Sequence, residues 1–379
     1  MRLPEFLLER YFARHEFTAP RLLCCSDCET WTITELLALE PDAAEGFLNL
    51  RLGYTEAAGG LELRRAVASL YQDIRPDQVL IFSGAEEAIF ILMNVALESG
   101  DQAVVHWPCY QSLFEVAAGL GCRTVKWAAR EETGWQLRLD DLEALLRPET
   151  RLVIINSPHN PTGALIPGRV LVELNRLSRE RGFVVFSDEV YRCLEYEPGS
   201  RPPAFCDLNE TAVSLGVMSK SFGLAGLRLG WIATRNRELL DRMAAFKDYT
   251  TICASGPGEY LAALALRHRE RLIDRNREII RINLERLEAF FGRRRDVFNW
   301  QPPQAGPIAF PSLKEGDAGR FCREAIEGAG VLLLPGEVYG PEYAGNFRIG
   351  FGRKDMPASL ARLEEYLERR IPAAPGRGA

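Results

Sequence analysis

Four polar residues in separate segments could together carry out chemistry on an amine: Lys220, Asp188, Asn160 and Arg348. The chain holds 46 lysines plus arginines but only five lysines, so a lysine kept in the Ser/Gly-rich segment 217–231 is poorly explained as generic surface charge. A lysine amine can lose its proton when it is desolvated and then attack a carbonyl, which a guanidinium cannot do. Lys220 is therefore our first candidate for covalent chemistry.

The other three residues each have an ordinary explanation when taken alone. Asp188, in SDEVYR, could cap a turn at the end of a strand, and Asn160, in NSPHNPTG, could serve a plain Asn-Pro turn. Arg348, in NFRIGF, could form a structural salt bridge. Taken together they match an enzyme that uses pyridoxal 5′-phosphate (PLP), which needs a lysine for the aldehyde, a carboxylate for the ring nitrogen and a clamp for the substrate carboxylate.

Such an enzyme also needs a phosphate site, and the segment SGAEEA (83–88) offers one. It joins a predicted strand to a predicted helix, so Gly84, Ala85 and Glu86 would present backbone N–H groups at a helix N-terminus to an anion. Ser219 and Arg228, on either side of Lys220, could add contacts to the same phosphate. Glycine is common in such turns, so this segment counts only beside the other residues.

The elements that must position these residues alternate between strand and helix along residues 79–234. Apolar runs predict strands at 79–82, 103–107, 152–156, 183–187 and 212–217, and helical spacing predicts helices at 85–97, 139–146 and 167–182. The alternation predicts an α/β fold with a largely parallel sheet and helices on both faces. Ligands of such sheets bind at the carboxyl ends of the strands, where Gly84, Asn160, Asp188 and Lys220 fall.

The rest of the chain predicts a second, smaller domain. Residues 256–295 predict a long connecting helix, and short strands and helices after Pro302-Pro303 predict an α+β domain. Its expected strands are 307–311, 331–335 and 346–351, and its expected helices are 317–328 and 357–370. We expect four parts: an N-terminal segment that joins the small domain or covers the cleft (1–45), a large domain (46–280, with its helix reaching about 295), a small domain (296–371) and a disordered tail (372–379).

Composition narrows the class of protein. A net charge of −6 disfavours nucleic acid as a partner, because binding a phosphate backbone needs a basic face. The sequence has no stretch of about 18 apolar residues and no signal-peptide pattern at its start, so we expect no membrane partner. Nine cysteines without disulfide-like spacing favour the reducing cytoplasm. Cys25 and Cys28 form a CxxC, but no second CxxC or His pair accompanies it, so no metal site is predicted.

In this order, NSPHNPTG, SDEVYR, the Ser-Lys-Ser-Phe-Gly segment running to Arg228 and the late FRIG resemble the class I/II aminotransferases, the fold type I enzymes of the aspartate aminotransferase family. The intervals fit as well, with 28 positions from Asn160 to Asp188 and 32 from Asp188 to Lys220. The resemblance spans roughly residues 48–352. It implies PLP as the cofactor and a large domain with a mainly parallel sheet beside a smaller α+β domain.

The resemblance also assigns roles to the matching residues. It implies that Lys220 binds the cofactor aldehyde and shuttles a proton, that Asp188 pairs with the pyridinium, and that Arg348 holds the substrate α-carboxylate. The other implied cofactor contacts are stacking by Tyr110, donation to the ring oxygen by Asn160 and Tyr191, and phosphate binding by Gly84, Ala85, Glu86, Ser219 and Arg228, joined by Tyr54 of a neighbouring subunit. The last of these implies a homodimer with shared active sites.

The N-terminal segment departs from the family pattern. Where a Gly-containing loop over the substrate is usual, this sequence has LLCCSDCETWT (22–32). Asp27 and Glu29, with Glu16 upstream, would bring negative charge towards the cleft, which favours a substrate with a cationic or strongly polar side chain; a solvent-facing loop is the alternative. Asn160 is expected to contact that substrate as well. No second arginine is identifiable as a clamp for a side-chain carboxylate, so a dicarboxylic substrate is not supported.

We therefore expect a cytoplasmic PLP-dependent aminotransferase that moves the α-amino group of an amino acid to a 2-oxo acid. The opening also resembles enzymes that cyclise arginine derivatives, so a PLP-dependent lyase or cyclase acting on a polar or cationic amino acid is the nearest alternative. A non-catalytic PLP-binding sensor is a distant alternative, because no residues remain for a basic DNA-binding domain. A nicotinamide-binding enzyme is not supported, because the sequence has no GxGxxG after its first predicted strand. A nucleotide-binding P-loop is not supported either, because no glycine directly precedes Lys220.

Overall fold

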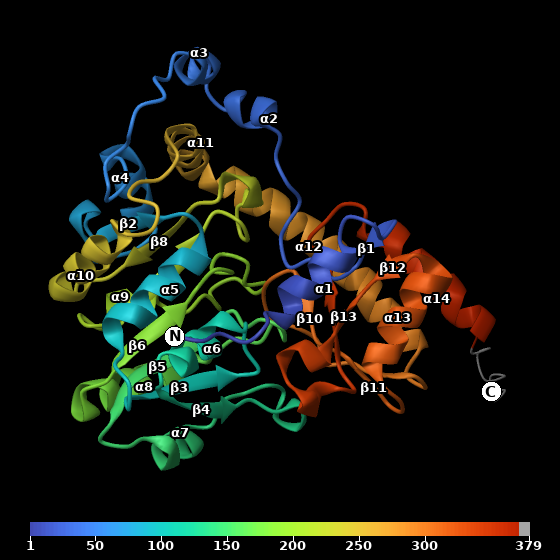
Figure 1. Cartoon of the computed structure of the whole chain (residues 1–379). Helices are drawn as coiled ribbons and strands as arrows, with labels where there is room; N and C mark the ends of the chain where they lie inside the picture. Colours follow the sequence, from blue (N-terminus) through green and yellow to red (C-terminus); the bar gives the residue numbers. More distant parts are fainter. Residues whose placement is uncertain (371–379) are drawn as a thin grey trace.

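The computed structural model describes residues 1–370, so the predicted tail over 372–379 lies outside the described residues. Its centre is a seven-stranded sheet in the order β2-β8-β7-β6-β5-β3-β4 (Figure 1). The strands are β2 (Val79–Phe82), β3 (Gln102–Trp107), β4 (Arg123–Ala128), β5 (Thr150–Asn156), β6 (Val184–Asp188), β7 (Val213–Val217) and β8 (Gly230–Ala233). Strands β3 to β7 pair in parallel, whereas β8 is antiparallel to both β2 and β7. The predicted mainly parallel sheet is thus confirmed.

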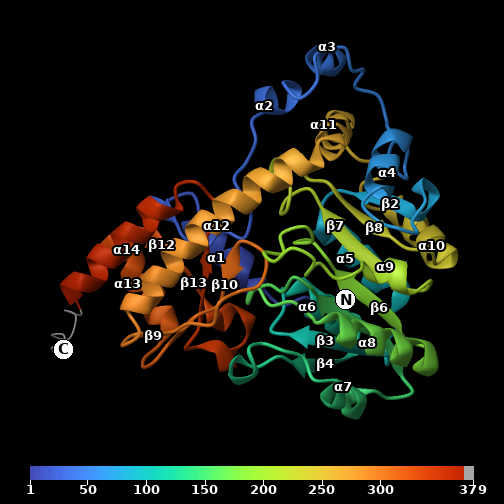
Figure 2. The ribbon, with the colours of Figure 1, turned by 180° about the vertical axis from the view of Figure 1, so that it is seen from behind.

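Helices pack around this sheet, which explains why its strands are apolar. They are α4 (Leu61–Ala68), α5 (Ala85–Ala96), α6 (Ser112–Gly119), α7 (Leu139–Leu145), α8 (Gly168–Arg181), α9 (Phe205–Leu208) and α10 (Arg237–Lys247). Seen from behind, α8 and α9 lie in front of the sheet and α5 behind it (Figure 2). Every residue of β2, β3, β7 and β8 is buried, as expected for strands covered on both faces. The edge strand β4 exposes Arg123 and Lys126, so its charged sequence gave no clear strand pattern.

The predicted single helix over 256–295 is wrong in one respect, because it is two helices. Helix α11 (Gly256–Arg267) ends at His268, and α12 (Arg269–Arg293) begins after it, with His268 at φ −107° and ψ 22°. The apolar spacing continues across this bend, so the sequence pattern does not mark it. Helix α12 then runs from the large domain to the small one (Figures 1 and 2).

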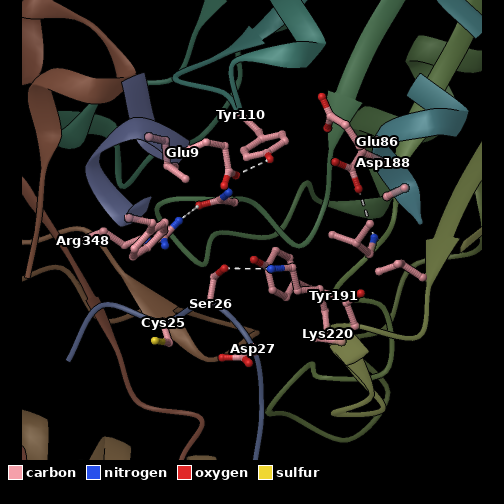
Figure 3. A pocket seen from close by; sticks show the side chains of 18 of the residues that line it. Glu9, Cys25, Ser26, Asp27, Glu86, Tyr110, Asp188, Tyr191, Lys220 and Arg348 are labelled. Carbon is pink, nitrogen blue, oxygen red and sulfur yellow. Dashed lines mark hydrogen bonds between the residues drawn. The ribbon is translucent and has the colours of Figure 1, made fainter. Parts of the chain in front are cut away.

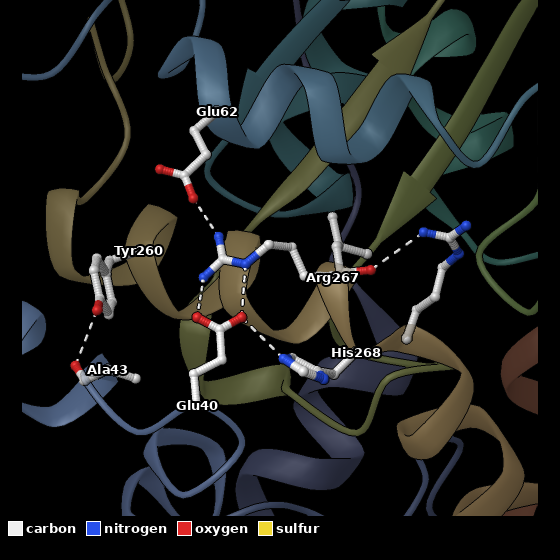
Figure 4. Close-up of polar contacts among 8 residues, drawn as sticks. Glu40, Ala43, Glu62, Tyr260, Arg267 and His268 are labelled. Atoms are coloured by element: carbon white, nitrogen blue, oxygen red, sulfur yellow. Dashed lines mark hydrogen bonds and ion pairs between the residues drawn. The ribbon is translucent and has the colours of Figure 1, made fainter.

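Polar contacts at the bend fasten the N-terminal segment to the large domain (Figure 4). Helices α2 (Ile33–Leu37) and α3 (Ala43–Leu48) lie along α11. Between them Glu40 accepts two hydrogen bonds of 2.9 Å from Arg267 and contacts His268 at 2.9 Å, while Arg267 also pairs with Glu62 of α4. Tyr260 donates to the carbonyl of Ala43 at 2.9 Å. These contacts hold the segment that precedes Tyr54.

The small domain is built from short strands and two helices. The strands are β9 (Phe298–Asn299), β10 (Ile308–Ala309), β11 (Ser312–Leu313), β12 (Val331–Leu332), β13 (Leu334–Pro335) and β14 (Phe347–Gly350), and the helices are α13 (Ala318–Ala329) and α14 (Met356–Arg370). Strands β10, β14 and β13 form one antiparallel sheet, and β11 pairs with β9.

Single 3-10 turns occur in both domains. They are η1 (Pro76–Gln78), η2 (Glu131–Thr133) and η3 (Ala225–Leu227) in the large domain, and η4 (Gly336–Tyr339) and η5 (Pro341–Tyr343) in the small domain.

The first residues of the chain both join the small domain and reach across the cleft. Strand β1 (Arg21–Leu22) pairs in parallel with β12. Helix α1 (Leu7–His15) lies between the two domains (Figure 1). The backbone N–H of Leu7 donates to Gln111 of the large domain, and the hydroxyl of Tyr11 donates to the carbonyl of Leu333 in the small domain, both at 2.9 Å.

Candidate active site

A cavity of about 600 Å³ lies at the carboxyl edge of the sheet, between the large and small domains (Figure 3). Its walls bring together most of the residues that the sequence singled out, although they come from segments far apart in the chain. Those that line it are Asp27, Ala85, Glu86, Tyr110, Asn160, Asp188, Tyr191, Ser219, Lys220, Arg228 and Arg348. Cavities of this size are typical of small-molecule sites.

Strand register brings Asn160 and Asp188 to the same edge. Asn156, the last residue of β5, lies opposite Asp188, the last residue of β6. The Asn156 amide donates to the Asp188 carbonyl at 3.0 Å, and its oxygen accepts from the backbone N–H of Asn160 at 2.6 Å. The turn that carries Asn160 is therefore fixed by the strand beneath it.

Asp188 is a buried carboxyl group without a cationic partner among the described residues. It is 5% exposed, and its Oδ1 accepts one hydrogen bond of 3.1 Å, from the backbone N–H of Val190. Burial raises the pKa of Asp188 to about 7, since desolvation disfavours the charged form. A cationic group placed beside it would restore the carboxylate, and a protonated pyridine nitrogen is such a group.

Lys220 lies just after β7, and its amine reaches into the cavity (Figure 3). Its Nζ donates to the hydroxyl of Ser26 at 2.8 Å and lies 5.9 Å from the ring centre of Tyr191. Burial lowers the pKa of Lys220, which raises the fraction of neutral, nucleophilic amine. This is the state that carbonyl chemistry requires.

Arg348 is 1% exposed and is held by neighbours on both sides of its guanidinium. Its Nε and Nη2 donate to the carbonyl of Cys24 at 3.2 and 2.9 Å. Its Nη1 donates to Oδ1 of Asn160 at 3.2 Å and to the hydroxyl of Tyr339 at 2.7 Å. Tyr339 also donates to the same Asn160 oxygen, at 3.0 Å. Because that oxygen is occupied, the Asn160 amide nitrogen is the atom left to donate to a ligand.

The predicted phosphate cradle is formed around the start of α5. Gly84 is the N-cap of this helix, with φ 87° and no side-chain cap, so the first N–H groups of α5 remain open to an anion. The positive φ of Gly84 favours glycine, and a Cβ there would lie 2.8 Å from Nη2 of Arg228, so glycine also leaves room for this guanidinium beside the helix N-terminus. Within residues 1–370 the buried hydroxyls of Ser219 and Tyr191 have no hydrogen-bond partner. These groups fit the phosphate and ring oxygen of PLP.

Tyr110 and Glu86 line the same side of the cavity. The Tyr110 hydroxyl donates to Glu9 of α1 at 2.8 Å, so the tyrosine is tied to the N-terminal helix (Figure 3). Glu86 accepts a hydrogen bond of 3.0 Å from Ser112, and burial raises the pKa of this carboxyl to about 7. Its backbone, at the helix N-terminus, is therefore better suited to a phosphate than its side chain.

Two predicted residues lie elsewhere. Tyr54 is 92% exposed and does not line the cavity of its own chain, so its expected role in a neighbouring subunit stays a prediction. Glu29 does not line the cavity either, which corrects the expectation that it faces the substrate. Its carboxylate accepts from the backbone N–H of Lys354 at 2.9 Å, and Arg275 donates to its carbonyl, so the residue is turned towards other parts of the chain.

Several residues of the site were not predicted. Glu9 and Phe12 line the cavity from α1, Ser26 holds Lys220, and Tyr339 holds Arg348. The helical spacing of Leu8 and Phe12 was a signal for α1, but nothing in the sequence indicated that Glu9 would face the cavity. Glu16, which was expected near the cleft, does line the cavity. Within residues 1–370, no group of three or more His, Cys, Asp or Glu side chains could hold a metal ion. The cysteine loop instead supplies the Cys24 carbonyl that positions Arg348.

Comparison with known proteins places this geometry in a family. The family model of aminotransferase class I and II matches residues 23–362. Capreomycidine synthase from Streptomyces vinaceus is 32% identical over 96% of this chain and 94% of its own length. The crystal structure of a PLP-dependent aminotransferase from Streptococcus suis is 29% identical, with a TM-score of 0.92 over all of both chains. That of the PLP-dependent cyclase OrfR is also 29% identical, with a TM-score of 0.90 over 98% of this chain and 99% of that one.

The match covers both domains and all four sequence motifs, and the cavity holds groups suited to each part of PLP. The chain belongs to the aminotransferase class I and II family and is a PLP-dependent transferase.

Proposed function

We propose that this transferase moves the α-amino group of an amino acid to a 2-oxo acid, with Lys220, Asp188 and Arg348 in the roles that the family resemblance implies. The observation that carries the proposal is the Lys220 amine, whose pKa is lowered by burial in a cavity that also presents the buried Asp188 and Arg348. An amine, an acid and a guanidinium with these separate tasks are what amino-group transfer requires.

When bound, PLP supplies an aldehyde for the amine and an electron-withdrawing ring that acidifies the substrate Cα. Asp188 would keep the ring nitrogen protonated, and that charge would in turn lower the raised pKa of Asp188. The Asn160 amide nitrogen and the unpartnered Tyr191 hydroxyl would donate to the ring oxygen. Ser219, Arg228 and the first turn of α5 would hold the phosphate.

The remaining residues act on the substrate. Arg348 would bind the α-carboxylate, and the contacts from Cys24 and Tyr339 keep its guanidinium from turning away. Lys220 would take the Cα proton and return it to the product as a general base and acid, a task suited to an amine with a lowered pKa. In the chain without PLP, the hydroxyl of Ser26 accepts a hydrogen bond from Nζ of Lys220 and holds this amine at the cavity wall.

A second candidate is a cyclase or lyase reaction on a polar or cationic amino acid. It is favoured by the similarity to capreomycidine synthase and OrfR over nearly the whole chain, and by Glu9, Glu16 and Asp27 in the cavity wall. The two reactions share the proton abstraction by Lys220 and differ in what leaves afterwards.

Spectroscopy on the PLP-loaded enzyme tests both candidates. The purified protein is mixed with single amino acids, without a 2-oxo acid, and the visible absorbance of the cofactor is followed. A transaminase loses the starting absorbance and keeps the amino group on the cofactor, whereas a cyclase or lyase releases product and regains its starting spectrum. If no amino acid changes the spectrum while PLP stays bound, both proposed reactions are overturned.

We also propose a homodimer in which Tyr54 reaches the phosphate site of the neighbouring subunit. Tyr54 is 92% exposed, and Leu52 and Tyr249 are 85% and 90% exposed, so this surface offers large apolar side chains that a second subunit could cover. Lys247, donating to the Ala57 carbonyl at 2.6 Å, ties the two exposed segments together.

The cytoplasmic location remains a proposal that rests on the free cysteines. All nine are free thiols, eight of them buried, as expected in a reducing compartment. Within residues 1–370 there is no helix of the length and apolar character needed to cross a membrane.

A further inference from the structure

We infer that Glu9 and Glu16, on the cavity face of α1 and its C-terminal end, recognise a positively charged group at the end of the substrate side chain. This inference rests on the proposed function, since it names the class of amino acid that the site accepts. Neither carboxylate is among the groups proposed to contact PLP or to move the Cα proton, and Glu9 contacts the cavity-lining Tyr110 only through the hydroxyl of that residue. Together they would make the site selective for guanidinium or ammonium side chains.

The geometry of the N-terminal helix places both carboxylates against the substrate. Glu9, Phe12 and Glu16 are spaced by three and four residues, so they lie on one face of the helical segment, and all three line the cavity. The helix is fastened to Gln111 in the large domain and to Leu333 in the small domain, so this face stays turned inward.

Within residues 1–370, no cationic side chain forms an ion pair with the carboxylate of Glu9 or of Glu16. The Glu9 carboxylate accepts a single hydrogen bond, from the Tyr110 hydroxyl, and the Glu16 carboxylate makes no hydrogen bond or ion pair with any of residues 1–370. Partial burial raises the pKa of Glu16, and the nearby Arg353 guanidinium, which lowers it, does not offset the loss of water. By contrast, Asp27 in the same wall is matched by Arg353, through hydrogen bonds of 3.1 and 2.9 Å.

The inner cations of the cavity cannot supply this missing charge. Arg228 is required for the cofactor phosphate, Arg348 for the substrate carboxylate, and Lys220 for the Cα proton. Of the charged groups on the outer side, three are carboxylates and one is a guanidinium, Arg353, which Asp27 already occupies. A cation on the ligand would neutralise the remaining negative charge of Glu9 and Glu16. That the cavity is built for a ligand is shown independently by the buried, unpartnered hydroxyls of Tyr191 and Ser219.

The spacing suits a long side chain. The ring of Phe12 lies 5.8 Å from the Arg348 guanidinium, so it borders the place where the α-carboxylate would bind. At 1.5 Å of helix rise per residue, Glu9 and Glu16 lie about 4–6 Å along the axis on either side of Phe12. Phe12 would therefore face the methylene groups of the substrate. The charged end of the substrate would lie on one side of Phe12, beside one carboxylate, and the other carboxylate would add to the negative potential from the far side of the ring. Arginine, lysine and ornithine have this shape.

Arginine and citrulline provide the test, because they match in size and differ in charge. The PLP-loaded enzyme is titrated with each, and dissociation constants are read from the visible spectrum. We expect arginine to bind about 100-fold more tightly than citrulline, since hydrogen bonds to charged groups contribute more than those to neutral ones. Glu9→Gln and Glu16→Gln should each weaken arginine binding about 10-fold and leave citrulline within about 2-fold.

Three controls separate charge recognition from damage to the fold. The glutamine at position 9 can still accept from Tyr110, so the substitution removes charge alone. Glu5→Gln, on the exposed stretch before α1, should leave both affinities unchanged. Calorimetry with 5-guanidinopentanoate, which has the carboxylate and the cation but no α-amine, measures binding without reaction and should show the same losses. Thermal melting checks that each variant is folded.

Equal affinity of the unaltered enzyme for arginine and citrulline would overturn this inference and leave the proposed function standing. So would equal losses for both ligands in the two glutamine variants. A spectrum that no amino acid changes, together with calorimetric binding of 5-guanidinopentanoate, would instead overturn the proposed function and keep the binding site. Selective loss of arginine and 5-guanidinopentanoate binding supports the inference.

Discussion

The two walls of the active-site cavity are built in different ways. The inner wall, formed by Asn160, Asp188 and Lys220, follows the carboxyl ends of β5, β6 and β7, where the register of a buried sheet fixes each backbone position. The outer wall, formed by α1 and the loop at 23–27, consists of a half-exposed helix and irregular backbone that reach across from the small domain.

This difference indicates that the two walls have separate functions. The inner wall presents groups whose pKa values are shifted by burial, Asp188 upwards and Lys220 downwards, as a catalytic site requires. The outer wall presents carboxylates whose arrangement depends on how one helix docks. We expect changes in the inner wall to abolish the reaction and changes in the outer wall to alter which substrate is used.

The largest effect should follow loss of the inner-wall amine. Lys220→Ala should lower turnover by about 10⁴-fold, because it removes both the covalent attachment and the proton carrier. Borohydride treatment followed by mass spectrometry should find PLP fixed to the unaltered chain and not to the variant. The variant should stay folded, since a desolvated lysine contributes little to stability. Cofactor fixed to the alanine variant would contradict the assignment of Lys220.

The inner wall was also the part that the sequence predicted best. Lys220, Asp188 and Asn160 each follow an apolar run, and parallel strands bring such ends to one edge, so their proximity could be inferred without a structure. The outer wall could not be inferred in this way. Glu9 and Phe12 lie on a helix whose docking depends on single hydrogen bonds to Gln111 and Leu333, which leave no periodic signal.

Arg348 joins the two walls, and its replacement should have the next largest effect. Arg348→Lys should weaken binding of every amino acid about 100-fold, because an ammonium cannot bind a carboxylate bidentately or keep the contacts to Cys24 and Asn160 at once. Spectral titration should show similar losses for arginine and citrulline. A loss confined to one of them would assign Arg348 to the side chain instead.

The pH dependence of the free energy of unfolding should reveal the buried proton on Asp188 of the inner wall when PLP is absent. The folded chain holds a proton on Asp188 up to about pH 7, whereas the unfolded chain releases it near pH 4. The folded state therefore binds more protons in this interval, and its stability falls as the pH rises.

Asp188→Asn removes that proton exchange, so its melting temperature should fall less between pH 5 and pH 8, by roughly 2–5 °C. Glu86, whose pKa burial also raises to about 7, contributes in the same direction and remains in the variant. Adding PLP should flatten the curve of the unaltered protein, because the ring cation lowers the pKa of Asp188. Identical slopes for both proteins without PLP would contradict the buried proton.

The smallest effect is expected in the outer wall, at the pair of Asp27 and Arg353. The pair is partly exposed, with 14% and 28% of the two side chains accessible, so it contributes about 1 kcal/mol or less to stability. Asp27→Asn should lower arginine affinity only about 2–3-fold, since Glu9 and Glu16 remain. It also frees the Arg353 guanidinium in the cavity wall, so glutamate should bind more tightly than before. Titration with arginine, citrulline and glutamate measures all three. An unchanged glutamate affinity would mean that Arg353 faces away from the substrate, and specificity would then rest on α1 alone.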